Sequence, residues 1–508
     1  MDSLIPLFVI IPLATAFLIP IIGKLTIYFA KTITPVVLLI LCFYSITLLL
    51  SNSKETYIVG GWQPVEDIPI GIYLVLDSFS ILILCIISII GFLVSFYSFE
   101  YISYYTSENN FYALFCLMIA GMNGVVLSGD IFNLFVFLEI SVIASYALVA
   151  FGVGKNELEA SFKYQVLGNI ASFLILLSIS LLYWQTKTLN IADISEVLQT
   201  SDDSAFLKFT QVLLISGFGL KAAIIPFHAW IPDAHSSAPS PVSAMLSGVL
   251  IKAVGVYVII RLFFNMFVFT HEIAMVITVL GTLSMIIGAL LAINQSDIKR
   301  LLAYSSISQI GYIIIGFGIG MVVLSKGGKV SIAVLAIAGA LFHMVNHAVF
   351  KGLLFLCAGA VEYRTNTRDM GQLGGLAENM PITSTSSLGA SLSISGIPPF
   401  NGFFSKLIII IAAVQARFYL VAFLAVVVSI ITLAYFLKFQ KRVFYGVNKN
   451  YKNVKEVPFA MSFSMIVLVV LCLGLSILVI PSIRELILDP AVNTLINMDQ
   501  YINQVIQY

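Results

Sequence analysis

The chain has 508 residues, of which 60% are hydrophobic and only 10% charged, and its formal net charge is +1. This composition excludes an ordinary soluble domain, in which about a quarter of the residues are charged. The sequence has no long basic block and no zinc-finger or phosphate-loop spacing, which excludes nucleic-acid binding.

The apolar runs predict an all-α polytopic membrane protein. A helix that crosses a bilayer needs about 20 mainly apolar residues. With this length as the criterion, the sequence predicts fourteen spanning helices at residues 4–22, 27–50, 72–98, 110–128, 131–152, 160–184, 209–230, 241–266, 273–293, 301–322, 329–359, 382–414, 417–440 and 458–481. No cleavable signal is expected, because the first apolar run follows no positively charged region and continues into further spans.

The basic residues predict the orientation of these helices. Fourteen of the 26 Lys and Arg residues, Lys299 among them, fall in loops after odd-numbered spans. Eight, Arg261 among them, fall in loops and tails on the opposite side. Because cytoplasmic loops carry an excess of Lys and Arg, we expect both termini on the non-cytoplasmic side of the cell (inner or plasma) membrane.

The remaining four lysines and one carboxylate lie inside predicted spans. They are Glu139, Lys221, Lys252, Lys351 and Lys406. Such a residue at a helix centre costs about 2.5 to 3.5 kcal/mol on insertion scales, so five of them require a reason. One explanation is structural: Glu139 pairs with one lysine, and the others extend to the interface.

The other explanation is that these groups exchange protons along a hydrated interior path. Burial lowers the pKa of a lysine, and a nearby carboxylate raises it again. A Glu-Lys pair that opens and closes would therefore switch the proton affinity of the lysine. Several such groups in series would relay protons laterally.

Two predicted spans contain helix-breaking residues at mid-membrane. The seventh includes GLKAAIIPFHAW (residues 219–230) and the twelfth includes ISGIPPFNGFFSK (residues 394–406). Each has glycines, a proline that removes a helical hydrogen bond, and a lysine nearby. Proline kinks without a transport role are the alternative, but paired breaks in matching positions indicate inverted repeats around a transport site.

The breaks divide the chain into four parts. We predict N-terminal helices 1–3 at residues 1–109 and a first repeat of helices 4–8 at residues 110–266. A second repeat of helices 9–13 follows at residues 267–440. A basic loop, helix 14 and a short C-terminal tail occupy residues 441–508.

The eleventh span places three titratable side chains on one helix face. His343, His347 and Lys351 are spaced by four residues in FHMVNHAVFK (residues 342–351). A histidine titrates near neutral pH, so this row could bridge the two repeats, with His228 of the seventh span as a further relay candidate. Structural hydrogen bonding is one alternative. Zinc binding is another, but the nearby sequence offers no third ligand, and we expect no metal site.

At this point the residues resemble a known family. The motifs that support the resemblance are GDIFNLFVFLEI (residues 129–140), GLKAAIIPFHAWIPDAH (219–235), DIKRLLAYSSISQIGY (297–312), the row on the eleventh span and the break in the twelfth. They are similar to the antiporter-like subunits shared by respiratory complex I, membrane-bound hydrogenases and Mrp cation/proton antiporters. The first motif looks closest to the Mrp D-type subunit and its hydrogenase counterpart.

The resemblance implies two inverted five-helix repeats with broken helices 7 and 12. It also implies that Glu139, Lys221, Lys252 and Lys406 transfer protons, together with His347, for which His343 is the other candidate. The chain has no iron-sulfur, flavin or quinone signature, so we expect no cofactor here, and any redox chemistry belongs to partner subunits of an oxidoreductase complex.

The expected function is therefore proton translocation within a multi-subunit membrane complex, either an Mrp-type sodium/proton antiporter or a hydrogenase or complex I relative. Expected partners are other membrane subunits, the lipid bilayer, protons and, in an Mrp complex, sodium. Two alternatives remain open from the sequence. One is a membrane scaffold that transports nothing, and the other is an organic-anion transporter that uses Lys221 or Lys406 to bind a carboxylate.

Overall fold

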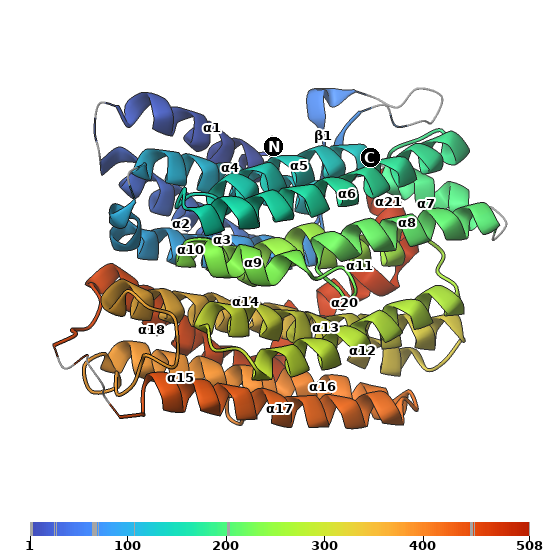
Figure 1. The fold of residues 1–508 in the computed structure, drawn as a ribbon. Helices are drawn as coiled ribbons and strands as arrows, with labels where there is room; N and C mark the ends of the chain where they lie inside the picture. The colour runs from blue at the N-terminus through green and yellow to red at the C-terminus, as the bar shows by residue number, and fades with distance from the viewer. Residues whose placement is uncertain are drawn as a thin grey trace.

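The computed structural model describes residues 4–506 except residues 25, 27, 63–68, 70, 106, 201–203, 448–450 and 452. Long helices lie roughly side by side along one direction, with the N-terminal half above the C-terminal half in Figure 1. The N-terminal half contains α1 (Leu7–Ile22), α2 (Tyr28–Ser51), α3 (Ser78–Tyr101), α4 (Glu108–Leu127), α5 (Ile131–Val149), α6 (Lys155–Thr186), α7 (Ile191–Gln199), α8 (Ala205–Lys221), α9 (Trp230–Ser237), α10 (Ser240–Met245) and α11 (Tyr257–Asn265).

The C-terminal half begins with helices that follow the predicted spans and ends with three short ones. They are α12 (His271–Ile293), α13 (Ile298–Ser325), α14 (Val330–Thr365), α15 (Pro381–Ser395), α16 (Asn401–Gln415), α17 (Tyr419–Val443), α18 (Phe459–Gly474), α19 (Pro481–Ile487), α20 (Asp489–Ile496) and α21 (Met498–Ile506). The sequence did not predict α7, the helices after α18, or the antiparallel hairpin of β1 (Glu55–Ile58) and β2 (Tyr73–Leu76).

The all-α membrane architecture is confirmed. Among the described residues, eleven helices are long and apolar enough to cross a membrane, and α1 and α16 are shorter apolar helices. Helix is present in each of the fourteen predicted spans. The count of fourteen crossings, the two repeats and the four-part division stay predictions.

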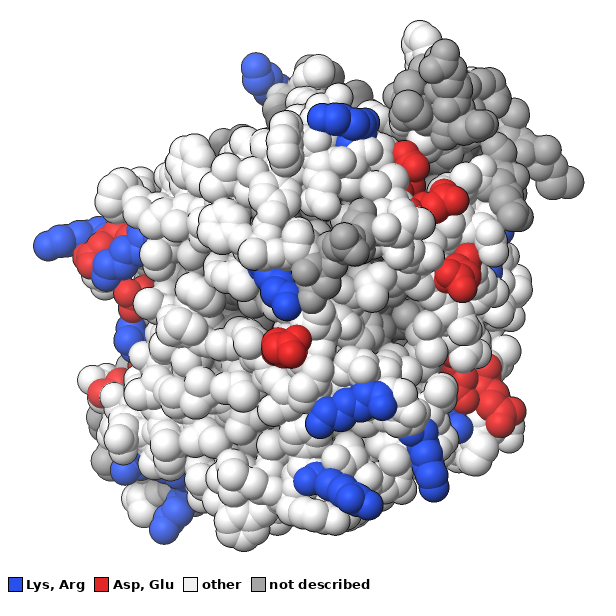
Figure 2. Space-filling model, turned by 90° about the vertical axis from the view of Figure 1, so that its right-hand side faces the viewer, with Lys and Arg blue, Asp and Glu red and all other residues white. Residues whose placement is uncertain are grey.

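The bundle has two ends, which lie at the left and right of Figure 1. The right-hand end holds β1, β2 and α7, and we name it the hairpin face. Its charged side chains are scattered over a mostly uncharged surface (Figure 2). The opposite end holds Asp233, Asp297, Arg300 and Arg368, and we name it the Asp233 face. Loops after odd-numbered predicted spans lie at the Asp233 face.

The predicted breaks are present in the seventh and twelfth spans. Helix α8 ends at Lys221 and α9 begins at Trp230. Helix α15 ends at Ser395, where Gly396 takes a φ of +80° that other residues rarely adopt, and α16 begins at Asn401. The eighth span holds a third irregularity that was not predicted, because residues 246–250 and 252–256 are π-helical on both sides of Lys252.

Three predicted loop residues are instead buried in ion pairs, and one of them is Lys31 of α2, 2.8 Å from Glu108. Arg261 lies in α11, where its Nη1 atom is 2.7 Å from Asp77 Oδ2 and both side chains are almost fully buried. Lys299 lies in the first turn of α13, 3.2 Å from Glu362. Their assignment to loops was wrong, because basic residues near a span end were counted as loop residues, whereas a carboxylate from another segment of the chain neutralises each of them within a helix.

The Arg261 pair connects distant parts of the chain. Asp77 also caps α3 by accepting a hydrogen bond from Ser80 N, and Arg261 lies over the ring of Tyr501 from α21. Asn265, which accepts from Arg261, donates to Thr494 O. The pair therefore attaches the C-terminal helices to α3 and α11.

The replacement Arg261→Met should destabilise the protein by roughly 3 to 5 kcal/mol, because it leaves the buried Asp77 carboxylate without a counter-charge. The double variant Asp77→Asn/Arg261→Met should recover most of this loss, since Asn still caps α3. Thermal unfolding of the purified protein in detergent measures both effects. Arg484→Met breaks a pair nearer the surface and is the matched control, with an expected loss of about 1 kcal/mol or less. A double variant as unstable as the single one would contradict the prediction.

The helix that carries Glu139 begins at a partly buried carboxylate. Asp130 caps α5 by accepting a hydrogen bond from Asn133 N at 2.6 Å. Burial raises the pKa of Asp130 to about 6 from an ordinary value of 3.8, and the backbone hydrogen bonds oppose this only in part. The folded state therefore binds this proton more tightly than the unfolded chain does, and stability falls as the pH rises from 3.8 to about 6.

The replacement Asp130→Asn should remove this pH dependence, because Asn is an equally good cap and carries no charge. We expect the variant to unfold at a higher temperature than wild type above pH 6. Near pH 4 the two proteins should unfold at the same temperature. Melting curves across this pH range provide the test, and an equal or lower melting temperature above pH 6 would contradict it.

Candidate functional site

One carboxylate and one lysine meet where the broken seventh span ends. Glu139 Oε1 on α5 is 3.5 Å from Lys221 Nζ at the last residue of α8. Between them, Ser172 of α6 donates to Glu139 Oε1 at 2.5 Å and accepts from Lys221 Nζ at 3.1 Å. The Lys221 side chain is 2% exposed and that of Glu139 is 23% exposed, so the pair extends from the interior to the outer surface of the bundle.

The backbone around the next lysine is unusual. Lys252 Nζ donates to the carbonyl oxygens of Ser247 and Gly248, each at 2.5 Å. Both carbonyls belong to the first of the two π-helical segments, an irregularity that occurs frequently at functional sites. Gly255 follows in the second segment, and a Cβ there would lie 2.7 Å from Ala222, so a glycine is needed for α8 to approach this closely.

The predicted row on α14 is fully buried. Lys351 donates to the Leu302 carbonyl at 2.7 Å and to the Ser305 hydroxyl of α13. His347 lies within electrostatic reach of Lys252 and Lys351. Its ring contacts Phe350, and among the described residues neither ring nitrogen has a well-formed hydrogen bond, although the Ser306 backbone lies nearby. The row therefore faces Lys252 across the interior.

His343 joins this row to the broken twelfth span. Its Nδ1 atom is 3.0 Å from Ser405 Oγ on α16. Asn346 and Asn401 exchange hydrogen bonds beside it, and Asn401 accepts a further one from Ser393 at 2.5 Å. This amide and hydroxyl cluster ties α14 to both parts of the broken span.

The last lysine lies on α16. Lys406 Nζ donates to the carbonyl of Ile394, in the last turn of α15, at 2.8 Å. It also lies over the Tyr312 ring at 4.7 Å, where the face of an aromatic ring attracts a cation. In the part of the chain that the structure describes, Lys252, Lys351 and Lys406 have no carboxylate within 4.0 Å.

One predicted residue lies apart. His228 is half-buried in the break between α8 and α9, next to exposed Pro226 and Ala229. None of its described contacts joins it to the other predicted relay residues. Among the described residues, no three His, Cys, Asp or Glu side chains gather as metal ligands.

The sequence analysis missed the neutral partners of these charges. Ser172, Ser305 and Ser405 bond to Lys221, Lys351 and His343, each on another helix, and Ser is common in apolar spans. His235 of α9 was not predicted as a site residue either. Its side chain is fully buried, and among the described residues neither ring nitrogen has a hydrogen-bond partner. The sequence feature that could have indicated this residue is a histidine in the polar connector WIPDAHSSAP (residues 230–239).

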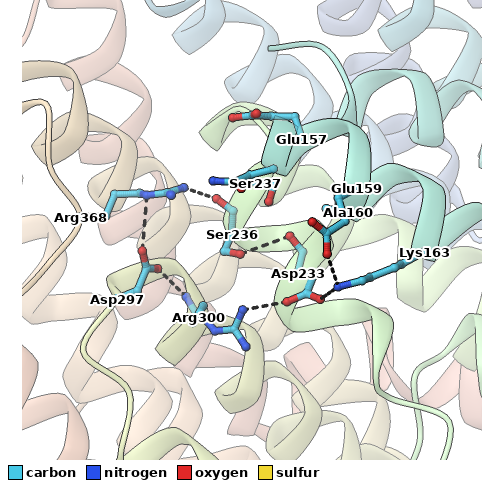
Figure 3. Close-up of a pocket in the computed structure, with 11 residues that line it drawn as sticks. Glu157, Glu159, Ala160, Lys163, Asp233, Ser236, Ser237, Asp297, Arg300 and Arg368 are labelled. Atoms are coloured by element: carbon cyan, nitrogen blue, oxygen red, sulfur yellow. Dashed lines mark hydrogen bonds and ion pairs between the residues drawn. The ribbon is translucent and has the colours of Figure 1, made fainter. Parts of the chain in front are cut away.

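At the Asp233 face lies an open cavity of about 240 Å³ lined by charged side chains (Figure 3). Asp233 Oδ1 is 2.7 Å from Arg300 Nη1, and Asp233 Oδ2 is 3.1 Å from Lys163 Nζ. Partial burial opposes ionisation of Asp233, but these two cations outweigh it and hold its pKa below the usual range. Arg368 closes the other side by pairing with Asp297 and donating to the Ser236 carbonyl.

Comparison with protein families finds matches over most of the chain. The model described as "NADH:quinone oxidoreductase/Mrp antiporter, TM" matches residues 128–432, which include all eight predicted proton-transfer and relay residues. A second model, described as "NADH-Ubiquinone oxidoreductase (complex I), chain 5 N-terminus", matches residues 62–112.

Two curated relatives cover most of the chain. The NADH-quinone oxidoreductase subunit N of Desulforudis audaxviator is 35% identical over 441 residues, which are 85% of this chain and 84% of the relative. The D-type subunit of the Na(+)/H(+) antiporter of Alkalihalophilus pseudofirmus is 34% identical over 455 residues, which are 87% of this chain and 88% of the relative.

Two solved membrane complexes contain a chain of the same fold. A chain of the Mrp complex from Dietzia sp. DQ12-45-1b superposes with a TM-score of 0.88 and 26% identity. A chain of the membrane-bound sulfane sulfur reductase, an archaeal respiratory complex, superposes with a TM-score of 0.87 and 28% identity. Each match covers 99% of both chains, so the full helical arrangement is shared.

The replacement Ser172→Ala should weaken the function that depends on the Glu139 and Lys221 pair. It removes a hydrogen bond to a charged group, which is worth about 1.5 to 3 kcal/mol and corresponds to a rate loss of about tenfold or more. Ion transport by vesicles that contain the assembled complex is the measurement. Ser180→Ala on the same helix is the matched control, because Ser180 is exposed and bonds only its own helix. Equal transport by the two variants would exclude a role for the Ser172 bridge.

Proposed function

Because the chain belongs to the NADH:quinone oxidoreductase/Mrp antiporter family of membrane subunits, we propose that it moves protons as one subunit of a multi-subunit ion-pumping complex. The observation that supports this most directly is the series of buried titratable side chains from Glu139 on α5 to Lys406 on α16. Buried charges inside a membrane protein mark ion pathways and proton relays. The proposed host is an Mrp-type sodium/proton antiporter or a related respiratory complex.

Glu139 and Lys221 form the proposed switch. In the closed state, the carboxylate and Ser172 hold the protonated amine. When the pair opens, Lys221 loses its counter-charge in a medium of low dielectric constant, and release of its proton becomes favourable. The proton passes toward Lys252, because Gly255 and Ala222 bring the two helices into contact.

From Lys252 the proposed path continues through His347 and Lys351 to His343 and Lys406. Carbonyl oxygens stabilise a protonated lysine without fixing it as strongly as a carboxylate does, so these positions can gain and lose protons. Between His343 and α16, Ser405 supplies a hydroxyl group that can rotate, and Asn346 holds this hydroxyl by a hydrogen bond from its amide. Lys406 loads or releases protons at the far end.

The energy for this movement comes from outside the chain in our proposal. In an Mrp complex it would be the counter-movement of sodium, and in a respiratory complex it would be electron transfer in partner subunits. We place the protein in the cell (inner or plasma) membrane with the Asp233 face toward the cytoplasm, on the distribution of basic residues. Both termini would then lie on the other side of the membrane.

The replacements Glu139→Gln and Lys221→Met should each reduce proton transport by about tenfold or more, because each removes a proton-transfer group. The measurement is proton uptake by vesicles that contain the complete complex, after gel analysis has shown normal assembly. Glu272→Gln and Lys208→Met, which alter surface residues of α12 and α8, are the matched controls.

Full transport by either interior variant would refute the role of the pair. If Met can replace all four interior lysines without loss, a scaffold that transports nothing is the better explanation, because removal of buried charge often leaves stability unchanged. An organic-anion transporter would instead show stabilisation of the purified protein by its substrate.

A further inference from the structure

A second network of buried charges lies between the central lysines and the Asp233 face. Lys299 Nζ of α13 is 3.2 Å from Glu362 Oε2 of α14 and donates to the Ala238 carbonyl at 2.8 Å. Glu362 also accepts from Ser240 Oγ at 3.4 Å, and its other oxygen is 3.6 Å from Arg368. The Lys299 side chain is 1% exposed and that of Glu362 is 29% exposed, so this pair joins the interior to the surface.

Glu362 borders a cavity that opens at the protein surface. With Tyr101, Tyr105, Tyr363 and Asn366 it lines a space of about 140 Å³, several times the volume that one water molecule occupies. Arg368, its partner, also lines the larger cavity of Figure 3. Solvent therefore reaches the carboxylate end of this network.

His235 lies at the inner end of the same network. It directly precedes Ser236, whose carbonyl accepts from Arg368 at the rim of the larger cavity. Its ring is fully buried, and Lys299, Lys252 and Lys351 all lie within electrostatic reach. These lysines come from both the surface network and the central series, so His235 lies between the two.

Packing alone does not account for a histidine at this position. The ring makes edge contacts with Trp230 and Phe355, which a phenylalanine would make equally well. Within the described part of the chain, both ring nitrogens lack a hydrogen-bond partner. Each unsatisfied buried polar group costs about 1 to 3 kcal/mol of stability. An apolar ring would avoid this cost, so the histidine nitrogens are expected to have a function.

We propose that Glu362, Lys299 and His235 form a proton entrance from the Asp233 face to Lys252 and Lys351 in the middle of the series. This inference rests on the proposed function and specifies where protons join the path. The central lysines can then be loaded without transfer along the whole series from Glu139.

Four proton transfers make up one turn of the entrance. The Glu362 carboxylate takes a proton from solvent, and Lys299 gives a proton to the free nitrogen of the neutral His235 ring. His235 releases the proton on its other nitrogen to the neutral amine of Lys252 or Lys351, since the imidazole has both a donor and an acceptor nitrogen. Glu362 then returns its proton to Lys299, and a turn of the His235 ring, now in its other tautomer, restores the starting state with one proton moved inward.

The test compares variants of the complete complex in vesicles, with proton transport as the readout. His235→Phe and His235→Gln should each lower the rate about tenfold or more, because each removes the titrating group that lies within reach of both Lys299 and the central lysines. Glu362→Gln should have a similar effect, and Glu362→Asp should regain part of the rate. His271→Gln is the matched control, since His271 begins α12 near the hairpin face.

A double variant distinguishes two residues that act in one proton path from two independent structural defects. If His235 and Glu362 act in one entrance, His235→Gln/Glu362→Gln should be no slower than the slower single variant, whereas independent structural defects would multiply. Multiplying losses, or wild-type rates with either His235 variant, would overturn the entrance. If these variants transport normally while Glu139→Gln does not, the entrance fails and the proposed function stands. If the wild-type complex moves no protons, both fail.

Discussion

Main-chain carbonyl oxygens hold Lys252, Lys351 and Lys406, and three of these oxygens lie at irregular helix segments. Lys252 bonds to carbonyls of a π-helical segment, and Lys406 bonds to the carbonyl of Ile394, in the last turn of a broken helix. A regular helix would use these oxygens internally. The interruption and the lysine thus satisfy each other, because in a membrane neither a free carbonyl nor a bare ammonium group is tolerated alone.

This arrangement gives the interior an electrical asymmetry. Lys221 has a carboxylate, whereas the described surroundings of Lys252, Lys351 and Lys406 supply neutral oxygens. A charge held by dipoles is more easily moved than one held by an opposite charge. The carboxylate also lies at the outside of the bundle, beside exposed apolar residues of α5 and α6, where a neighbouring subunit could contact it.

Side chains that keep their charge and side chains that can lose it lie in different parts of the bundle. Arg261 and Asp77 form a fully buried pair with hydrogen bonds on several sides, and an arginine does not lose its proton. That pair stabilises the attachment of the C-terminal helices. Lysines and histidines, whose side chains can gain and lose protons, occupy the proposed central path and its proposed connection to the Asp233 face.

The sequence by itself determined the class of fold and the two proline breaks. It also showed that Glu139, Lys221, Lys252 and Lys406 are charged residues within predicted spans. Apolar length, helix-breaking residues and rare charges are local properties, and each is visible without knowledge of neighbouring helices. Only the tertiary structure decided what these charges contact. Ser172, Ser405 and His235 gain their importance from packing between distant segments, and Lys299 and Arg261 were misplaced because their partners lie far away in the chain. A charge in a membrane is stable only with its partners, and in this chain those partners come from other helices.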